Sequence, residues 1–167
     1  MKDLYLIENV LNDFLKEFDV TAEVAKEFCY LWEQNKILVT LAVPDFQTRN
    51  FMEDFHNRAP EIKLDCFLAC FFHELGHCET VDLLTDEEEL ECYRKRKILN
   101  EEAKKTTDEV KLAVICEEYH KLPDEYLATE WAINYIRNNV DKVAKFWSDL
   151  QKAILTVYEV NEVEDED

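Results

Sequence analysis

The residues whose types and spacing could support catalysis lie in one short segment, FFHELGHCET, at residues 71–80. His73 and His77 stand four apart, so on a helix their imidazoles lie one turn apart on the same face and can bind one metal ion. Glu74 is rotated by about 100° around the helix axis, so it does not join them as a ligand. Its carboxylate is placed to act as a general base toward water in a zinc hydrolase. The segment therefore predicts a Zn²⁺ site with His73 and His77 as ligands and Glu74 as the catalytic residue.

A catalytic zinc site needs a third protein ligand and an open fourth position. The preferred candidate is Glu125, in the segment PDEYLATEWAINYI at residues 123–136. Ala128, Thr129 and Ala132 share its predicted helix face, and a stripe of small residues lets two helices approach closely. The alternatives that the sequence leaves open are Glu130, Asp124, Glu79 and His120.

A peptide hydrolase also needs a hydrogen-bond donor, besides the metal, for the oxyanion of its transition state. The side chains one turn or one loop away from Glu125 that could donate are those of Tyr119, His120 and Tyr126. The sequence does not choose among these three.

Gly76 is the only glycine among the 167 residues, and it lies inside the motif. Glycine costs about 1 kcal/mol relative to alanine in a helix interior, so the position needs a reason. It faces away from both histidines, where a missing side chain would let another backbone segment or the substrate approach closely. The alternative is that it merely relieves helix packing.

The chain around the motif is predicted to be mainly α-helical, as a single domain over residues 1–158 followed by an acidic flexible tail at 159–167. Segment 62–78 is apolar almost all round, which is typical of a central helix. Thr85 and Glu88 form a capping box, and Thr106 and Glu109 repeat its spacing. Apolar periodicity predicts further helices at residues 4–18, 21–32, 124–137 and 140–158.

One stretch has a different texture. Residues 36–43, KILVTLAV, are rich in β-branched side chains and are followed by Pro44. This pattern predicts a short strand before the motif helix, with a possible partner strand within residues 46–58. The basic run Arg94–Lys97 is interpreted as a solvated helix face, with a docking patch as the alternative.

The formal net charge of −19 argues against direct nucleic-acid binding, because phosphates would be repelled. The first residues, MKDLYLIENV, carry charges where a signal peptide would be apolar. No apolar run is long enough to cross a bilayer. These features predict a cytoplasmic protein without a membrane partner, whose six cysteines are reduced.

The pairing of HELGH with a downstream Glu125, Ala128, Trp131 and Ala132 resembles the ImmA/IrrE-like zinc metallopeptidases. The resemblance covers about 25 residues in two blocks, and the gap between the blocks is longer than in the family. It implies a gluzincin-type site with His73, His77 and Glu125 on zinc and Glu74 as general base, in a small helical, zincin-like fold with a short β element before the active-site helix. Members typically come from phages, mobile elements and bacterial stress responses, and are linked to cleavage of regulator proteins in the same cell.

The sequence therefore predicts a zinc-dependent metallopeptidase that hydrolyses peptide bonds of a protein partner. One alternative is an acidic, non-catalytic binding protein, such as an inhibitor or DNA mimic, that keeps a structural or vestigial zinc site. A second alternative is a metal-free helical interaction protein in which HELGH occurs by coincidence. A catalytic site requires Glu74, whereas a structural zinc site does not.

Overall fold

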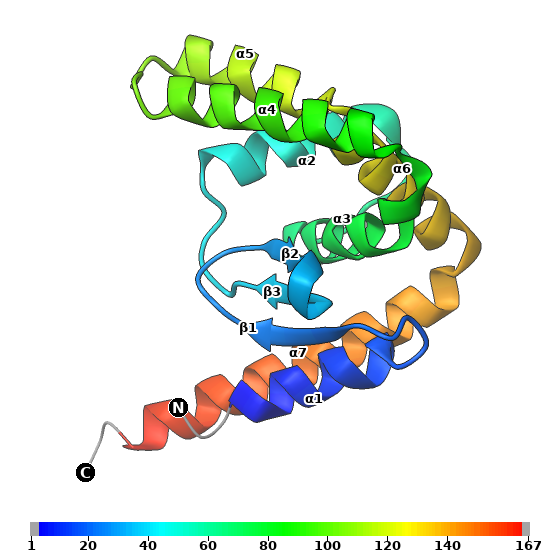
Figure 1. Cartoon of the computed structure of the whole chain (residues 1–167). Coiled ribbons are helices and arrows are strands. Elements are labelled where there is room, and N and C mark those ends of the chain that lie inside the picture. Colours follow the sequence, from blue (N-terminus) through cyan, green and yellow to red (C-terminus); the bar gives the residue numbers. More distant parts are fainter. Residues whose placement is uncertain (1–3, 165–167) are drawn as a thin grey trace. The chain divides into compact units, whose positions relative to one another are not determined.

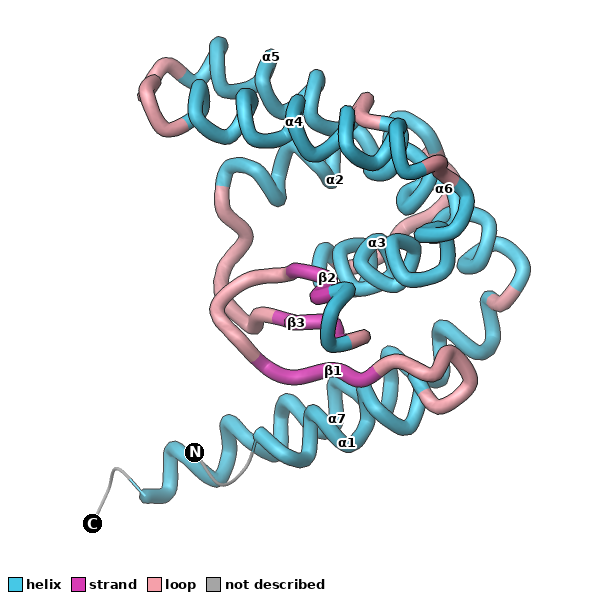
Figure 2. Tube along the Cα trace, in the orientation of Figure 1, coloured by secondary structure: helices cyan, strands magenta, loops and turns pink. Residues whose placement is uncertain are grey.

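The computed structural model describes the backbone of residues 4–164 and the side chains of residues 4–158. These residues form mostly helices and one small sheet, which confirms the predicted fold class (Figures 1 and 2). The elements are α1 (Leu4–Leu15), β1 (Thr21–Val24), β2 (Cys29–Leu31), the 3₁₀ turn η1 (Trp32–Gln34), β3 (Lys36–Val39), α2 (Phe46–Arg58), α3 (Cys66–Thr80), the 3₁₀ turn η2 (Val81–Leu83), α4 (Asp86–Ala103), α5 (Glu109–His120), α6 (Pro123–Asn138) and α7 (Val140–Glu164).

The chain divides into two compact units, one made of Met1–Leu41 and Ile136–Asp167 and the other of Ala42–Tyr135. None of the helices in the described part of the chain is long and apolar enough to cross a membrane. Residues 165–167 of the predicted acidic tail lie outside the described residues. The predicted domain boundary at residue 158 stays a prediction.

The first unit combines the sheet with α1 and α7. The strand order is β1-β3-β2, with β1 parallel and β2 antiparallel to the central β3. The register places Thr21 opposite Lys36 and Cys29 opposite Leu38. The free edge of β1 is capped by Asn12 of α1, whose side-chain amide donates to the Ala22 carbonyl at 2.9 Å and accepts from its N–H at 2.8 Å. An edge strand with its backbone groups occupied in this way is protected from pairing with another chain.

The predicted helix over residues 21–32 is wrong, because this segment forms β1 and β2. Asn35 adopts a left-handed backbone conformation with φ 47°, which lets the chain reverse direction between β2 and β3. The β-branched and aromatic residues before it then pair with β3, and this tertiary pairing outweighs the helix-like spacing. The predicted strand over residues 36–43 is confirmed in its first half as β3.

The possible partner strand within residues 46–58 is also wrong, because this segment is α2. The carboxylate of Asp45 accepts a hydrogen bond from the Thr48 N–H at 2.8 Å and so caps the helix. Phe51 and Phe55, one turn apart, are buried. A cap directly followed by apolar residues at helical spacing favours a helix over a strand.

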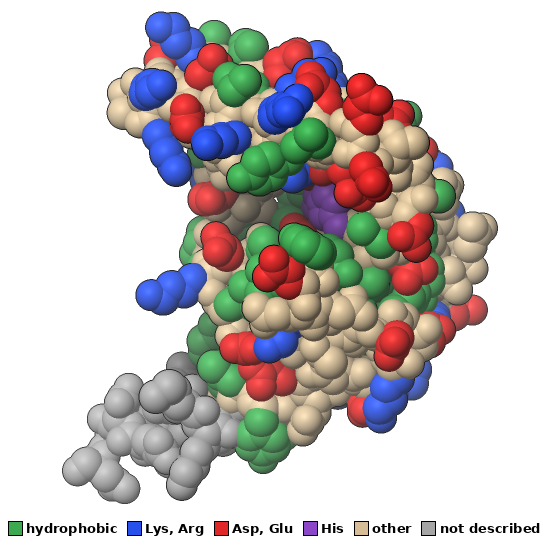
Figure 3. Space-filling model, in the orientation of Figure 1, with side chains coloured by type: hydrophobic (Ala, Val, Ile, Leu, Met, Phe, Trp, Pro, Cys, Tyr) green, Lys and Arg blue, Asp and Glu red, His purple; other side chains and the backbone are tan. Residues whose placement is uncertain are grey.

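The second unit holds the motif helix α3, together with α2, α4, α5 and all of α6 up to Tyr135. The capping box of Thr85 and Glu88 is confirmed at the start of α4. The second predicted box is wrong, because Asp108 rather than Thr106 caps α5, accepting from the N–H of Val110 at 3.0 Å. Basic and acidic side chains intersperse over α4 and α5 (Figure 3).

Helices α3 and α6 meet at Gly76, where the backbones come unusually close. A Cβ at this glycine would lie 2.2 Å from the carbonyl oxygen and 2.9 Å from the Cα of Ala128. Atoms that are not bonded cannot approach so closely. The expectation that a missing side chain admits another backbone segment is therefore confirmed, and that segment is the helix that carries Glu125.

Candidate metal centre

Three side chains converge on one point in the second unit. His73 Nε2 lies 3.0 Å from Glu125 Oε2 and 3.1 Å from His77 Nε2, and His77 Nε2 lies 3.4 Å from Glu125 Oε2. Of the described residues, these three are the one group of three or more potential ligands whose donor atoms all lie within 4.8 Å of one another. Glu125 and His73 are buried, with 5% and 8% of their surfaces exposed. This group could hold a metal ion.

The separations among these atoms fit tetrahedral coordination. Ligand atoms bonded to zinc at about 2.0–2.1 Å in a tetrahedron lie about 3.3 Å apart. The three measured separations of 3.0, 3.1 and 3.4 Å lie close to that value. Three lone-pair-bearing atoms so close together repel one another unless a proton or a cation lies among them. The donor set, two imidazoles and one carboxylate, is one that zinc accepts.

Thr129 assigns the tautomer of His73. The Thr129 hydroxyl donates its single hydrogen to the carbonyl of Glu125 at 3.0 Å, so its oxygen is left to accept from His73 Nδ1 at 3.0 Å. His73 therefore carries a proton on Nδ1, so in the neutral ring the lone pair lies on Nε2 and faces the cluster. The ring is also held by the Phe51 ring, whose centroid lies 4.8 Å away. This neutral tautomer is the form that binds metals.

The charges at the cluster also favour a cation. Burial by itself would raise the pKa of the Glu125 carboxyl, but the two histidines hold it well below its usual range. Burial would likewise lower the pKa of His77, but the carboxylate of Glu125 raises it to about 9. Without a metal, His77 is therefore protonated at neutral pH and supplies the positive charge that the carboxylate requires.

The second oxygen of Glu125 faces a different partner, Arg96 of α4. Arg96 Nη2 lies 3.0 Å from Glu125 Oε1 and also donates to Asp124 Oδ2. The guanidinium carbon lies 5.7 Å from the centroid of the Tyr119 ring. Burial, followed by the charge of Glu125 and a hydrogen bond to it, raises the pKa of the Tyr119 phenol. Tyr119 is thus neutral and able to donate beside the cluster.

Glu74, the predicted general base, lies next to the cluster on α3 and is partly exposed. Its negative charge contributes to raising the pKa values of both His77 and Tyr119. A carboxylate that acts on a ligand and on a nearby phenol stands within electrostatic reach of the point where the donor atoms converge.

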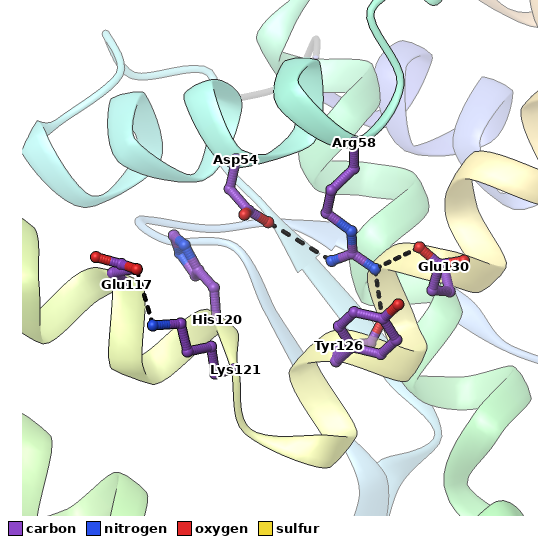
Figure 4. A pocket seen from close by; sticks show the side chains of 7 residues that line it. All are labelled: Asp54, Arg58, Glu117, His120, Lys121, Tyr126 and Glu130. Carbon is purple, nitrogen blue, oxygen red and sulfur yellow. Dashed lines mark hydrogen bonds and ion pairs between the residues drawn. The ribbon is translucent and has the colours of Figure 1, made fainter.

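Three other predicted residues line a separate pocket. His120, Tyr126 and Glu130 lie there with Asp54 and Arg58 of α2, with Glu117 of α5 and with Lys121, the residue that follows α5 (Figure 4). Arg58 pairs with Glu130 at 2.7 Å and lies over the Tyr126 ring at 4.2 Å from its centroid. None of the three cluster residues lines this pocket.

Of the four alternatives for the third ligand, the structure brings none to the cluster. Glu130 pairs with Arg58, Asp124 with Arg96, His120 lies against the Phe51 ring at 5.9 Å between centroids, and Glu79 is exposed. Glu125 alone of the five candidates approaches both histidines.

Two residues that support the cluster were not predicted to do so from the sequence. Arg96 is read from sequence as part of a solvated basic run, yet one member of that run faces Glu125. Thr129 is read as a small residue for helix packing, yet its hydroxyl contacts His73. The available signal for Thr129 was its spacing, four residues after Glu125 on the same predicted helix face. No signal in the sequence separates Arg96 from the other three cations of its run.

The candidate site thus joins three convergent donor atoms to a neighbouring carboxylate, a phenol and a guanidinium. Comparisons of the chain with protein-family models, with curated proteins and with solved structures found no match.

Proposed function

We propose that this protein is a zinc-dependent metallopeptidase in which His73, His77 and Glu125 hold the ion. The observation that carries the proposal is the convergence of two Nε2 atoms and one Oε2 atom at separations of 3.0–3.4 Å. The resemblance to ImmA/IrrE-like metallopeptidases supports the same ligand set. It also suggests the substrate, a peptide bond of a regulator protein.

Zinc in such a site acts as a Lewis acid and lowers the pKa of a coordinated water to about 7. The protein's own residues would divide the remaining work. Glu74 would accept a proton from the attacking water at a carboxylate oxygen and pass it to the leaving amine. Tyr119, kept neutral by its raised pKa, would redirect its hydrogen bond from Glu125 to the developing oxyanion.

The helices keep these groups in position. His73 and His77 stand on one face of α3, and the contact between Gly76 and Ala128 brings the first turn of α6 close enough for Glu125 to reach them. Thr129 orients His73 by its hydroxyl. Groups held by packing and by hydrogen bonds lose little entropy when the substrate reacts.

The test compares the zinc-loaded wild type with Glu74→Gln on a library of proteome-derived peptides, with new amino termini detected by mass spectrometry. We expect cleavage by the wild type and a rate about 10²–10⁴-fold lower for Glu74→Gln, with the zinc content unchanged. Glu79→Gln is the matched control, because Glu79 is an exposed glutamate on the same helix. Equal cleavage by wild type and Glu74→Gln, or none by the zinc-loaded wild type, would contradict the proposal and favour the acidic binding protein.

A further inference from the structure

The two oxygens of the Glu125 carboxylate have different partners. Oε2 faces the histidines, 3.0 Å from His73 Nε2 and 3.4 Å from His77 Nε2. Oε1 lies 3.0 Å from Arg96 Nη2 on the other side. A charge-assisted hydrogen bond to one oxygen fixes the orientation of a carboxylate and leaves the lone pairs of the other oxygen directed at the histidines.

We propose that Arg96 is a positioning residue for the metal centre, an inference that rests on the proposed function. It holds Glu125 Oε1, so that the carboxylate keeps one rotamer and presents Oε2 to the ion. Partners of this kind behind a metal ligand fix its orientation and tune its affinity.

The surroundings of Arg96 support this role. Asp124 takes a hydrogen bond from the same Nη2 atom, so the guanidinium bridges two adjacent carboxylates at the start of α6. The ring of Tyr119 lies beneath the guanidinium. A planar guanidinium suits bridging and stacking together, whereas a lysine ammonium is a point charge on a flexible stem.

The geometry of helix α4 determines which residue of the basic run Arg94–Lys97 can contact Glu125. Cys92 is buried and lies one turn before Arg96 on the same face, whereas Arg94, Lys95 and Lys97 are exposed. Consecutive residues on a helix are rotated by about 100°, so only one of the four cations faces Glu125. The long charged segment between the two motif blocks therefore contributes a side chain to the site.

Arg96 can affect zinc binding in two ways of opposite sign, so a measured change in affinity distinguishes between them. A positive charge beside a divalent cation repels it, so electrostatics alone predicts that removing Arg96 tightens zinc binding. Loss of positioning predicts that removing it weakens zinc binding. The measured direction decides between them.

The experiment measures zinc affinity of the full chain by competition with a chromophoric chelator, for the wild type, Arg96→Gln, Arg96→Lys and Arg94→Gln. We expect Arg96→Gln to bind zinc about 10–100-fold more weakly and Arg96→Lys to fall between it and the wild type. Arg94→Gln removes the same charge from the exposed face and should leave the affinity unchanged. Unfolding of the metal-free variants, followed by circular dichroism, controls for the fold.

The visible absorption spectrum of the cobalt-loaded proteins supplies a readout that a merely structural role would not move. Without Arg96 the Glu125 carboxylate keeps only its hydrogen bond with Tyr119 and can change its orientation toward the ion. The intensity of the cobalt bands should therefore change in Arg96→Gln and stay as in the wild type in Arg94→Gln. If Arg96→Gln fails to fold, Arg96→Lys decides by the same two measurements.

Wild-type affinity and cobalt spectrum retained in the folded Arg96 variant, or tighter zinc binding, would overturn this inference alone. A wild-type protein that binds no zinc would overturn the proposed function and this inference with it.

Discussion

At the scale of single residues, removal of the Thr129 hydroxyl tests whether this group holds His73 in the orientation of a metal ligand. Thr129→Val keeps the shape of the side chain and removes the acceptor for His73 Nδ1, so the ring can rotate or change its tautomer. We expect zinc affinity to fall about tenfold or more, as measured by chelator competition.

The chain offers a matched control for this variant. The buried Thr80 hydroxyl also donates to the carbonyl four residues before it, at 2.8 Å from Gly76 O. Thr80→Val removes that hydrogen bond to the backbone but no hydrogen bond to a histidine, and should keep wild-type zinc affinity. Equal affinities for the two variants would mean that Thr129 does not orient His73.

His120, in the pocket beside the cluster, should make stability depend on pH. Burial lowers its pKa, and the nearby carboxylates of Asp54 and Glu125 only partly offset that effect. As the pH falls below about 6.5, the unfolded chain binds a proton that folded His120 does not. The contribution of His120 to stability is therefore full above that pH and is lost as the pH falls toward the lowered pKa.

The measurement is urea unfolding at pH 7.5 and pH 5.5 with a chelator present. His77, whose pKa is raised to about 9, adds stability over the same fall in pH in both proteins. The change in stability from pH 7.5 to pH 5.5 should therefore be less favourable in the wild type than in His120→Gln, which lacks the second titrating group. His56→Gln, at an exposed histidine of α2, should behave like the wild type. An equal change in stability in His120→Gln and in the wild type would refute the expectation.

At this scale the motif predicted the ligand types but not their supporting partners. Helix geometry alone predicts that His73 and His77 share a face and that Glu74 lies beside them. The structure brings Glu125 to both histidines. Arg96 could not be selected from its run, because the orientation of α4 depends on how buried Cys92 packs. Sequence spacing fixes a face of a helix, but tertiary packing decides what that face meets.

At the scale of helices, the contact between α3 and α6 depends on Gly76. Gly76→Ala would place a Cβ 2.2 Å from the Ala128 carbonyl oxygen, so the helices must separate. The gain of about 1 kcal/mol in helix propensity is opposed by an overpacking cost of about 1–3 kcal/mol. We expect a net loss of stability in urea unfolding and weaker zinc binding, because Glu125 moves away with α6.

A second substitution identifies the atom responsible. The clash is with the backbone of residue 128, so the double variant Gly76→Ala/Ala128→Gly should remain as destabilised as Gly76→Ala, after allowing for Ala128→Gly alone. Recovery in the double variant would show that side-chain crowding, rather than backbone contact, requires the glycine.

The helices around the site were predictable because their signals are local. The capping box of Thr85 and Glu88 appears in the structure as expected. The apolar segment predicted over residues 62–78 forms α3, which begins at Cys66 because Asp65 caps it. The sheet was only partly predictable, because β1 and β2 exist through pairing with β3 rather than through their own pattern. Long-range pairing of this kind leaves little trace in the spacing of apolar residues.

At the scale of the whole molecule, the formal net charge of −19 should oppose folding through self-repulsion. Salt screens such repulsion, whereas the exposed ion pairs that it also screens contribute little. We expect the melting temperature of the chelator-treated protein to rise between 20 and 200 mM sodium chloride. Each kcal/mol by which salt stabilises the folded chain should raise the melting temperature by about 2–4 °C. A fall in melting temperature would mean that attractive pairs dominate the charge balance.

The candidate metal centre lies wholly within Ala42–Tyr135, one of the two compact units. Its ligands come from α3 and α6 and its arginine from α4. The site can therefore be tested in the full chain by substitutions confined to this unit.

The most direct test is zinc per chain, measured by mass spectrometry of the metal after purification without chelator. We expect one zinc per wild-type chain, a strong loss in Glu125→Ala, and wild-type content in Glu130→Ala, whose glutamate pairs with Arg58 instead. A wild type without stoichiometric zinc, or loss of zinc in Glu130→Ala but not in Glu125→Ala, would contradict the proposed metal centre.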